Sequence, residues 1–250
     1  MPSSDSKTDK HAMLIRFGGV ALLIGFAIHI VANVGIKQMP PEAPSLDELR
    51  AYLAAEVDSW AIVHGMRSIA IVSLAVFAAA LFTRTCCLRP VRPVGWGVIG
   101  LLGAILMLAN LMVTNGIETF VFLDADLAAT NAEVFWGLFN TTRVLFTAEV
   151  VTWAIFIGGF SAAGWLSATL PKWLSALGLV PTAFGVLSGV FVVSILTDGW
   201  ATLLIDTASL CGLAWFLCTG VYLLIRGDHV PQSPESAALE ADEATRAASA

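Results

Sequence analysis

The chain has 250 residues, of which 57% are hydrophobic and only 13% charged, and its mean hydropathy is +0.81. A soluble domain carries about 25% charged residues, so the composition excludes a water-soluble enzyme. The net charge of −6 does not indicate a nucleic-acid binder, because such proteins present a basic patch or stripe.

Six segments are long and apolar enough to cross a membrane as helices, which takes about 20 apolar residues. They lie at roughly 14–36, 60–83, 94–118, 134–160, 172–196 and 203–226. The first follows Lys7 and Lys10, as a signal peptide would, but its apolar run from Phe17 to Ile36 exceeds the roughly 7–15 residues of a signal-peptide core. We therefore expect an uncleaved first helix and an all-α, six-helix transmembrane domain over 14–226.

Basic residues are concentrated in alternate connections between these segments. One set of connections and termini holds Lys7, Lys10, Arg16, Arg84, Arg89, Arg92, Lys172 and Arg226. The other set holds only Lys37 and Arg50, together with most of the acidic loop residues. Because short loops rich in Lys and Arg stay in the cytoplasm, both termini, including the segment 1–13, are predicted to be cytoplasmic. The protein is expected to be a multi-pass protein of a bacterial inner membrane.

Two segments outside the spans have compositions of their own. Ser45 and Glu48 have the spacing of a capping box, and helically spaced apolar residues follow at Leu46, Leu49, Leu53 and Val57. This pattern predicts a short amphipathic helix over about 46–57 at the outer interface. We favour the interpretation that this helix seals the end of the bundle, and the alternative is that it forms a lid over a cavity. Residues 227–250 are rich in Ala, Ser and Glu without an apolar face, which predicts a disordered tail.

Glycines recur within the third and fifth spans. The run from Gly95 to Gly100 matches the GxGxxG pattern of dinucleotide-binding proteins, but that fingerprint needs a preceding strand. Inside an apolar span, these glycines and Gly103 are better interpreted as a face for close helix packing. Gly185 and Gly189 form a GxxxG pair with the same interpretation.

Polar and ionisable residues occur within five of the six spans, and each is a candidate functional residue because such groups are costly in a membrane. The set comprises His29, Asn33, His64, Arg67, Asn110, Thr114, Glu118, Asn140, Arg143, Glu149 and Asp206. In the expected orientation, most of them fall in the outer half of the bundle. A static interhelical network would explain any one of them. For the whole set we favour a polar cavity that receives a small lipophilic or amphipathic ligand.

Glu118 and Glu149 are the candidate catalytic groups, because a carboxyl in apolar surroundings near an arginine can serve as an acid or a base. The other members of the set are candidate ligand-binding residues. The protein would then be an enzyme or a transporter, with membrane lipids around it and no nucleic-acid partner. The alternative is a structural or accessory membrane subunit whose polar residues only fix helix packing. The oligomeric state is left open.

His29 and His64 raise the question of a haem, because each supplies one imidazole near the outer side of neighbouring helices. Their expected depths differ by only about 4–5 Å, so the geometry permits a shared haem. Two histidines are too few to specify a metal site, and ordinary hydrogen bonds would satisfy both rings. We expect no metal, no stoichiometric haem and no other cofactor.

The segment Pro171-Lys172-Trp173-Leu174-Ser175-Ala176-Leu177-Gly178 resembles the Pro-Arg/Lys-Trp-Leu-x-x-Leu-Gly segment of domain-of-unknown-function family 4386. The resemblance extends more loosely over residues 14–226. It implies a bacterial multi-helix inner-membrane protein and supplies no established reaction. The family places an Arg and a Glu about one turn apart in mid-chain, whereas Glu149 follows Arg143 by six residues here.

Overall fold

The computed structural model of the protein describes residues 4–36, 45–88, 94–123, 132–192, 194 and 199–227, which are helical apart from short turns. The helices are α1 (Ser4–Ile30), η1 (Val31–Ile36), α2 (Leu46–Phe82), η2 (Thr83–Cys87), α3 (Val94–Leu123), α5 (Ala132–Ser167), α6 (Lys172–Val190) and α8 (Thr202–Arg226). Within this part of the chain, six helices are long and apolar enough to cross a membrane, which confirms the predicted number. The tail from 228 onward lies outside the described residues.

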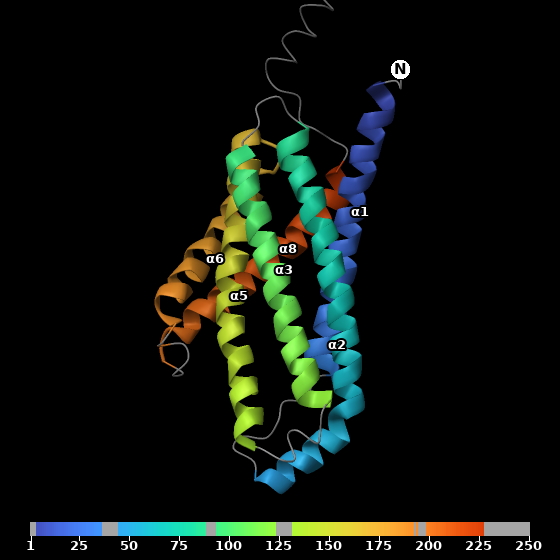
Figure 1. Cartoon of the computed structure of the whole chain (residues 1–250). Helices are drawn as coiled ribbons and strands as arrows, with labels where there is room; N and C mark the ends of the chain where they lie inside the picture. The colour runs from blue at the N-terminus through green and yellow to red at the C-terminus, as the bar shows by residue number, and fades with distance from the viewer. Residues whose placement is uncertain are drawn as a thin grey trace, which may run out of the picture.

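The two ends of the bundle are distinguished by the course of the chain in Figure 1. We call the end where α1 begins and α8 finishes the upper end, and the end where α2 begins the lower end. Consecutive helices pack against each other, and α8 packs back against α1, so the six long helices form a ring in chain order. A ring of this kind encloses an interior that all six helices can line.

Several helices are longer than the apolar runs from which they were predicted, including α3, which ends at Leu123 rather than 118. α1 begins at Ser4 rather than near residue 14, and α5 continues to Ser167 rather than 160. The helix expected over 46–57 and the span expected over 60–83 form one helix, because no Gly or Pro interrupts the chain between Leu46 and His64. Apolar runs mark where a helix can cross a membrane, and good helix formers extend it beyond that.

The start of α2 has the predicted capping box. The Oγ of Ser45 accepts from the backbone N–H of Glu48, whose carboxylate accepts from the N–H of Ser45 at 2.8 Å. The first turns of α2 run obliquely across the lower end (Figure 1). There Leu49, Leu53 and Trp60 form a buried cluster with Val121, Phe122 and Phe135 of α3 and α5. The segment over 46–57 therefore seals the lower end of these three helices.

The predicted glycine face of α3 is confirmed as a packing surface. A Cβ on Gly103 would lie 2.4 Å from the backbone N of Phe156, and one on Gly159 would lie 2.3 Å from the N of Gly100. Such distances exclude any side chain at these positions. The glycines thus allow the backbones of α3 and α5 to approach each other directly.

Aromatic side chains fill the interior of the ring in its upper half. Phe77 of α2 packs edge-on against Phe156 of α5 and Phe216 of α8, with ring centroids 6.2 and 5.9 Å apart. Trp215 is fully buried in the same cluster. These rings fill this part of the interior, and the cavity described below lies toward the lower end.

Arg84 is buried at the upper end, where its side chain connects several helix ends. Its side chain is fully buried and donates to the carbonyl oxygens of Thr169 and Gly227, at 3.3 and 2.8 Å, and to the hydroxyl of Tyr222 at 3.1 Å. The sequence placed Arg84 in the connection after the second predicted span, whereas the structure places it in η2 with its side chain buried. The guanidinium instead satisfies backbone carbonyls where η2, the α5–α6 turn and α8 meet, where helix ends carry partial negative charge.

Replacing Arg84 should therefore destabilise the folded bundle. We expect Arg84→Ala to lower the free energy of unfolding by about 2–4 kcal/mol, because it leaves buried carbonyl groups unsatisfied. Thermal unfolding in detergent measures the loss, and Arg226→Ala, at an exposed position in the last turn of α8, is the control. Equal melting temperatures for the two variants would contradict this role.

Candidate ligand-binding site

A cavity of about 520 Å³ lies inside the lower half of the ring, between residues of α1, η1, α2, α3, α5 and α8. Its volume is in the range of about 300–1,000 Å³ that is typical of small-molecule sites. The deeper part of its wall is apolar and includes Leu22, Leu74, Leu111, Leu213 and Phe216. Phe216 also belongs to the aromatic core, so that core forms the floor of the cavity. The polar side chains gather toward the lower end.

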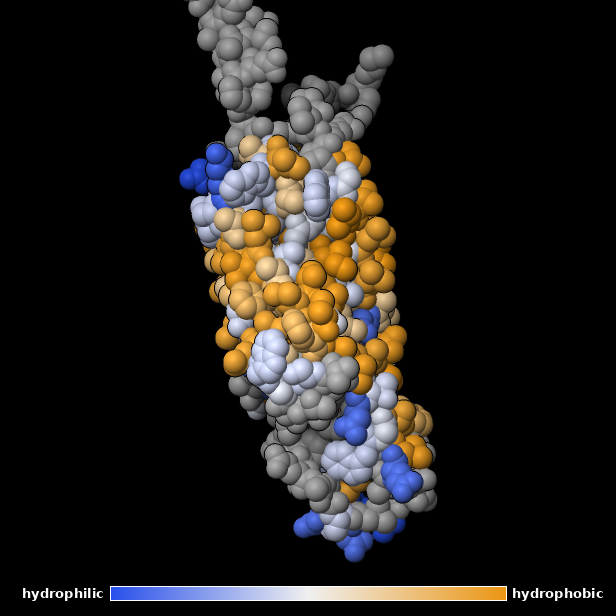
Figure 2. All heavy atoms as spheres, turned by 90° about the vertical axis from the view of Figure 1, so that its left-hand side faces the viewer, coloured by the Kyte–Doolittle hydropathy of each residue, from blue (hydrophilic) through white to orange (hydrophobic). Residues whose placement is uncertain are grey.

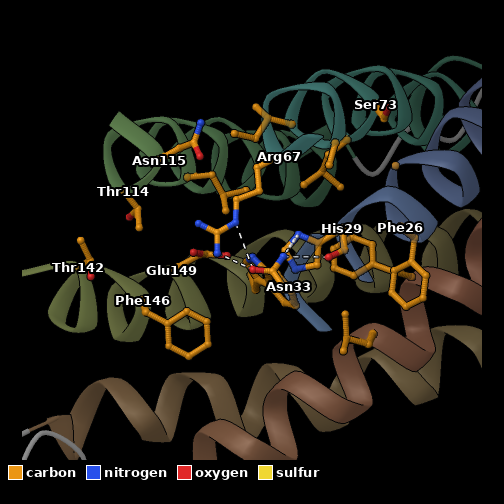
Figure 3. A pocket seen from close by; sticks show the side chains of 18 of the residues that line it. Phe26, His29, Asn33, Arg67, Ser73, Thr114, Asn115, Thr142, Phe146 and Glu149 are labelled. Atoms are coloured by element: carbon orange, nitrogen blue, oxygen red, sulfur yellow. Dashed lines mark hydrogen bonds between the residues drawn. The ribbon is translucent and has the colours of Figure 1, made fainter. Parts of the chain in front are cut away.

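Arg67 is the centre of a hydrogen-bond network that joins three helical segments. Its Nη1 donates to the carboxylate of Glu118 on α3, and its Nε donates to the Oδ1 of Asn33 on η1 at 3.1 Å. The Nη2 of Arg67 donates to the same oxygen. Asn33 in turn donates from Nδ2 to the carbonyl oxygen of His29 at 2.9 Å (Figure 3). The network fixes α1, α2 and α3 at one depth.

The pairing leaves little of this arginine available to a ligand. All three of its nitrogens donate to Glu118 or Asn33, and the partner carboxylate is only 7% exposed. Burying an unpaired charge in apolar surroundings is unfavourable by several kcal/mol, so the ion pair is what allows both groups inside the bundle. Arg67 and Glu118 are therefore a charge-neutral part of the cavity wall.

Glu149 differs from Glu118 in having no such partner. It is 5% exposed and lines the cavity from α5; its carboxyl interacts with the indole N–H of Trp153 but forms no ion pair with a described side chain. It lies on the same side of the cavity as Arg67 and Asn33 (Figure 3), close enough to be attracted by the arginine's charge. The cavity thus holds a buried carboxyl group that forms no ion pair with any cationic side chain among the described residues.

One further polar group of the wall makes no hydrogen bond with a described residue. The Oγ1 of Thr114 is buried and has no partner there. A buried polar group without a partner costs about 1–3 kcal/mol, so such groups are uncommon unless something else meets them. Together with Glu149, it marks the polar part of the wall as a place where a bound molecule would add polar contacts.

Most of the predicted site residues meet in this cavity. Those whose side chains line it are His29, Asn33, Arg67, Thr114, Glu118, Glu149 and Asp206. The backbone of Arg143 lies within α5, but its side chain is outside the described part of the structure. The cavity combines residues from five spans, which explains why the polar residues are dispersed so widely along the chain.

Three predicted residues lie elsewhere, which corrects their assignment to the cavity. His64 stacks on Trp60 with centroids 5.5 Å apart, and its Nδ1 lies 2.9 Å from the Oδ1 of Asn115. Asn110 donates to the carbonyl oxygen of Leu145 at 2.7 Å and ties α3 to α5. Asn140 is exposed. The side chains of His64 and Asn110 bond to neighbouring helices and that of Asn140 is exposed, so none of the three lines the cavity.

The positions of the two histidines bear on the haem question. His29 lines the cavity, whereas the ring of His64 belongs to the sealed contact of α2 with α3. The described residues therefore do not present both imidazoles to one space. They also contain no group of three or more His, Cys, Asp or Glu side chains that could hold a metal ion.

Several cavity residues were missed from the sequence. Asn115 and Thr147 are polar residues within spans and could have been included by the same rule as Thr114. Phe26, Phe146 and Trp153 also line the cavity, but no sequence signal separates them from aromatic residues that face lipid. Their contribution appears only when the helices are assembled.

Comparisons with family models, with curated proteins and with solved structures find no match for this chain. The likeness to domain-of-unknown-function family 4386 therefore stays a prediction. The interpretation of the cavity depends on its own geometry.

The coupling between Arg67 and Glu118 can be measured by a double-mutant cycle. Arg67→Met leaves a buried carboxylate without its partner and should lower the free energy of unfolding by about 3–5 kcal/mol. The double variant Arg67→Met, Glu118→Gln should lose less than the sum of the single variants, by about 1–3 kcal/mol. Chemical or thermal unfolding in detergent supplies the four stabilities. Strict additivity would show that the pair does not interact.

Proposed function

We propose that this is a multi-pass protein of a bacterial inner membrane that binds a small lipophilic or amphipathic ligand in the cavity. The proposal includes cytoplasmic termini, so that the lower end faces outward. The observation that carries it is a cavity with an apolar floor and a polar rim, in which the buried carboxyl of Glu149 has no ion-pair partner among the described residues. A bundle whose polar residues served only packing would have no need of this space.

The lengths of the helices support a position of the polar rim at the outer membrane surface. α6 and α8, with 19 and 25 residues, are about 28 and 38 Å long, close to the roughly 30 Å of a bilayer core. α2 and α5, with 37 and 36 residues, are about 55 Å long and must project beyond it. Figure 2 agrees, because the apolar surface gives way to hydrophilic side chains toward the lower end.

The start of α8 gives the depth of the cavity in this arrangement. Trp200, which is 64% exposed just before α8, is of the type that gathers at membrane interfaces. Thr202 and Asp206 at the beginning of α8 line the same cavity as Arg67. The polar rim then lies near the lipid head groups and the apolar floor among the acyl chains, which is how an amphipathic molecule is oriented in a bilayer.

The cavity opens to the surface beside exposed residues of α5 and α8. α1 and α8 touch closely in their upper halves, where a Cβ on Gly19 would lie 2.7 Å from the carbonyl oxygen of Gly220. α8 crosses the bundle obliquely, away from the lower part of α1 (Figure 1). Phe146 and Asp206 of the cavity wall are exposed. A ligand would therefore enter sideways from the outer leaflet.

The same geometry ranks the two candidate catalytic groups. Glu118 accepts from Arg67, whereas Glu149 is available to a bound molecule. In an enzyme, Glu149 would be the acid or base and the Arg67–Glu118 pair would position it electrostatically. In a transporter, Glu149 would be a ligand-binding group. Both versions need the cavity to be occupied, and the accessory-subunit alternative does not.

Filling the cavity should abolish binding without unfolding the protein. Ile71 and Leu213 line it, and Ile71→Trp with Leu213→Trp would occupy its apolar part. The control is Val72→Trp with Leu210→Trp, at neighbouring positions of the same helices that are 64% and 69% exposed. Native mass spectrometry with added decanol should show a bound alcohol in the wild type and the control only. Absence of the adduct in all three proteins would favour the accessory-subunit alternative.

The orientation is tested by reporter fusions. Fusions after residue 227 and within 84–93 should report the cytoplasm, and fusions within 40–58 and 124–133 the opposite side, because the basic connections stay inside. A periplasmic signal from the tail would refute the proposed topology.

A further inference from the structure

We infer that the head group of the ligand is a cation, such as an alkylammonium, and that Glu149 binds it. This inference rests on the proposed function and names its ligand class. It starts from the balance of charges around the cavity. The described charged side chains in its wall are one arginine, Arg67, and three carboxyl groups, on Glu118, Glu149 and Asp206.

The arginine does not offer a site for an anionic head group. Its nitrogens donate to Glu118 and Asn33, and the carboxylate of Glu118 neutralises its positive charge. A carboxylate or phosphate in the cavity would have to displace one of these partners and then meet Glu149 and Asp206. Like charges in a water-poor cavity repel strongly, so an anion is disfavoured.

Glu149 lacks the counter-ion that a buried carboxylate needs. Its side chain is 5% exposed and interacts with the indole N–H of Trp153, but no described cationic side chain forms an ion pair with it. A cation next to it would form the second ion pair of the cavity, in the way that Arg67 completes Glu118. Because water is scarce at this depth, one added ion pair with good geometry contributes strongly to affinity.

Aromatic rings flank this carboxyl on its own helix. Phe146 lies three residues before Glu149 and Trp153 four residues after it, so all three share one face of α5, and all line the cavity. Phe216 of α8 packs edge-on against Trp153, with centroids 5.4 Å apart and planes at 84°. A carboxylate among aromatic faces is the environment in which proteins bind alkylated ammonium groups.

The floor of the cavity suits the rest of such a molecule. Leu74, Leu111 and Leu213 lie deeper than the polar rim, and no charged residue lines the cavity at their level among the described residues. An alkyl chain there would bury apolar surface at about 25 cal/mol per Å². The cavity therefore matches a cation at the rim with a chain of moderate length below it.

A charge series at constant chain length tests this inference. Binding of decyltrimethylammonium, decanol and decanoate to the full-length protein in an uncharged maltoside detergent would be measured by native mass spectrometry or calorimetry. We expect the wild type to bind the cation on the order of tenfold more tightly than decanol, and decanoate most weakly. Glu149→Gln should remove this preference while decanol still binds. Glu133→Gln, at an exposed position in the first turn of α5, is the matched control.

The outcomes separate the two proposals. Binding of decanol without preference for the cation, or a preference that survives in Glu149→Gln, would overturn the inference and leave the ligand-binding cavity standing. Failure of all three amphiphiles to bind would overturn both proposals. If Glu149→Gln did not accumulate as folded protein, the wild-type charge series would decide alone, because tighter binding of decanol or decanoate than of the cation contradicts the inference.

Discussion

The lower half of this bundle depends on the requirement that charges inside an apolar protein be paired. Arg67 and Glu118 come from different helices, and Asn33 from a third segment holds the arginine from the other side. If α1, α2 and α3 slid past one another by one turn, about 5.4 Å, these contacts would be lost and two charges would stay buried. The pair thus sets the relative depth of three helices, and the cavity is the space that they then enclose with α5 and α8.

The interior of the ring is closely packed at its upper end and open at its lower end. Above, aromatic rings around Phe77 fill the interior, Gly19 brings α1 against α8, and Arg84 satisfies carbonyl groups that follow the ends of α5 and α8. Below, the start of α2 seals one side of the ring, while α8 leans away from α1 on the other. A bundle that is rigid at one end and hollow at the other can hold a ligand in a fixed cavity. Buried polar groups without a hydrogen bond to a described residue occur in both parts, such as Thr114 in the cavity wall and Ser161 in the packed half.

Sequence patterns predicted the helices well and the site only in part. Hydropathy identified the six spans because the apolar length needed to cross a bilayer is a local property. The rule that intramembrane ionisable residues mark functional sites identified Arg67, Glu118 and Glu149, which share the cavity. It failed for His64 and Asn110, because which way a polar side chain points depends on the rotation of its helix against its neighbours. The same limit hid Phe146 and Trp153, and it concealed that Arg84 is a buried contact rather than a loop charge.

The most direct test of the central claim is photolabelling with an alkylammonium that carries a diazirine in its chain. After irradiation in lipid nanodiscs, peptide mass spectrometry would locate the labelled residues, with and without excess decyltrimethylammonium as competitor. The account predicts competable labelling of residues on the cavity wall, including Phe146, Leu213 and Phe216. Labelling confined to lipid-facing residues such as Leu210, at a level that the competitor does not change, would contradict it.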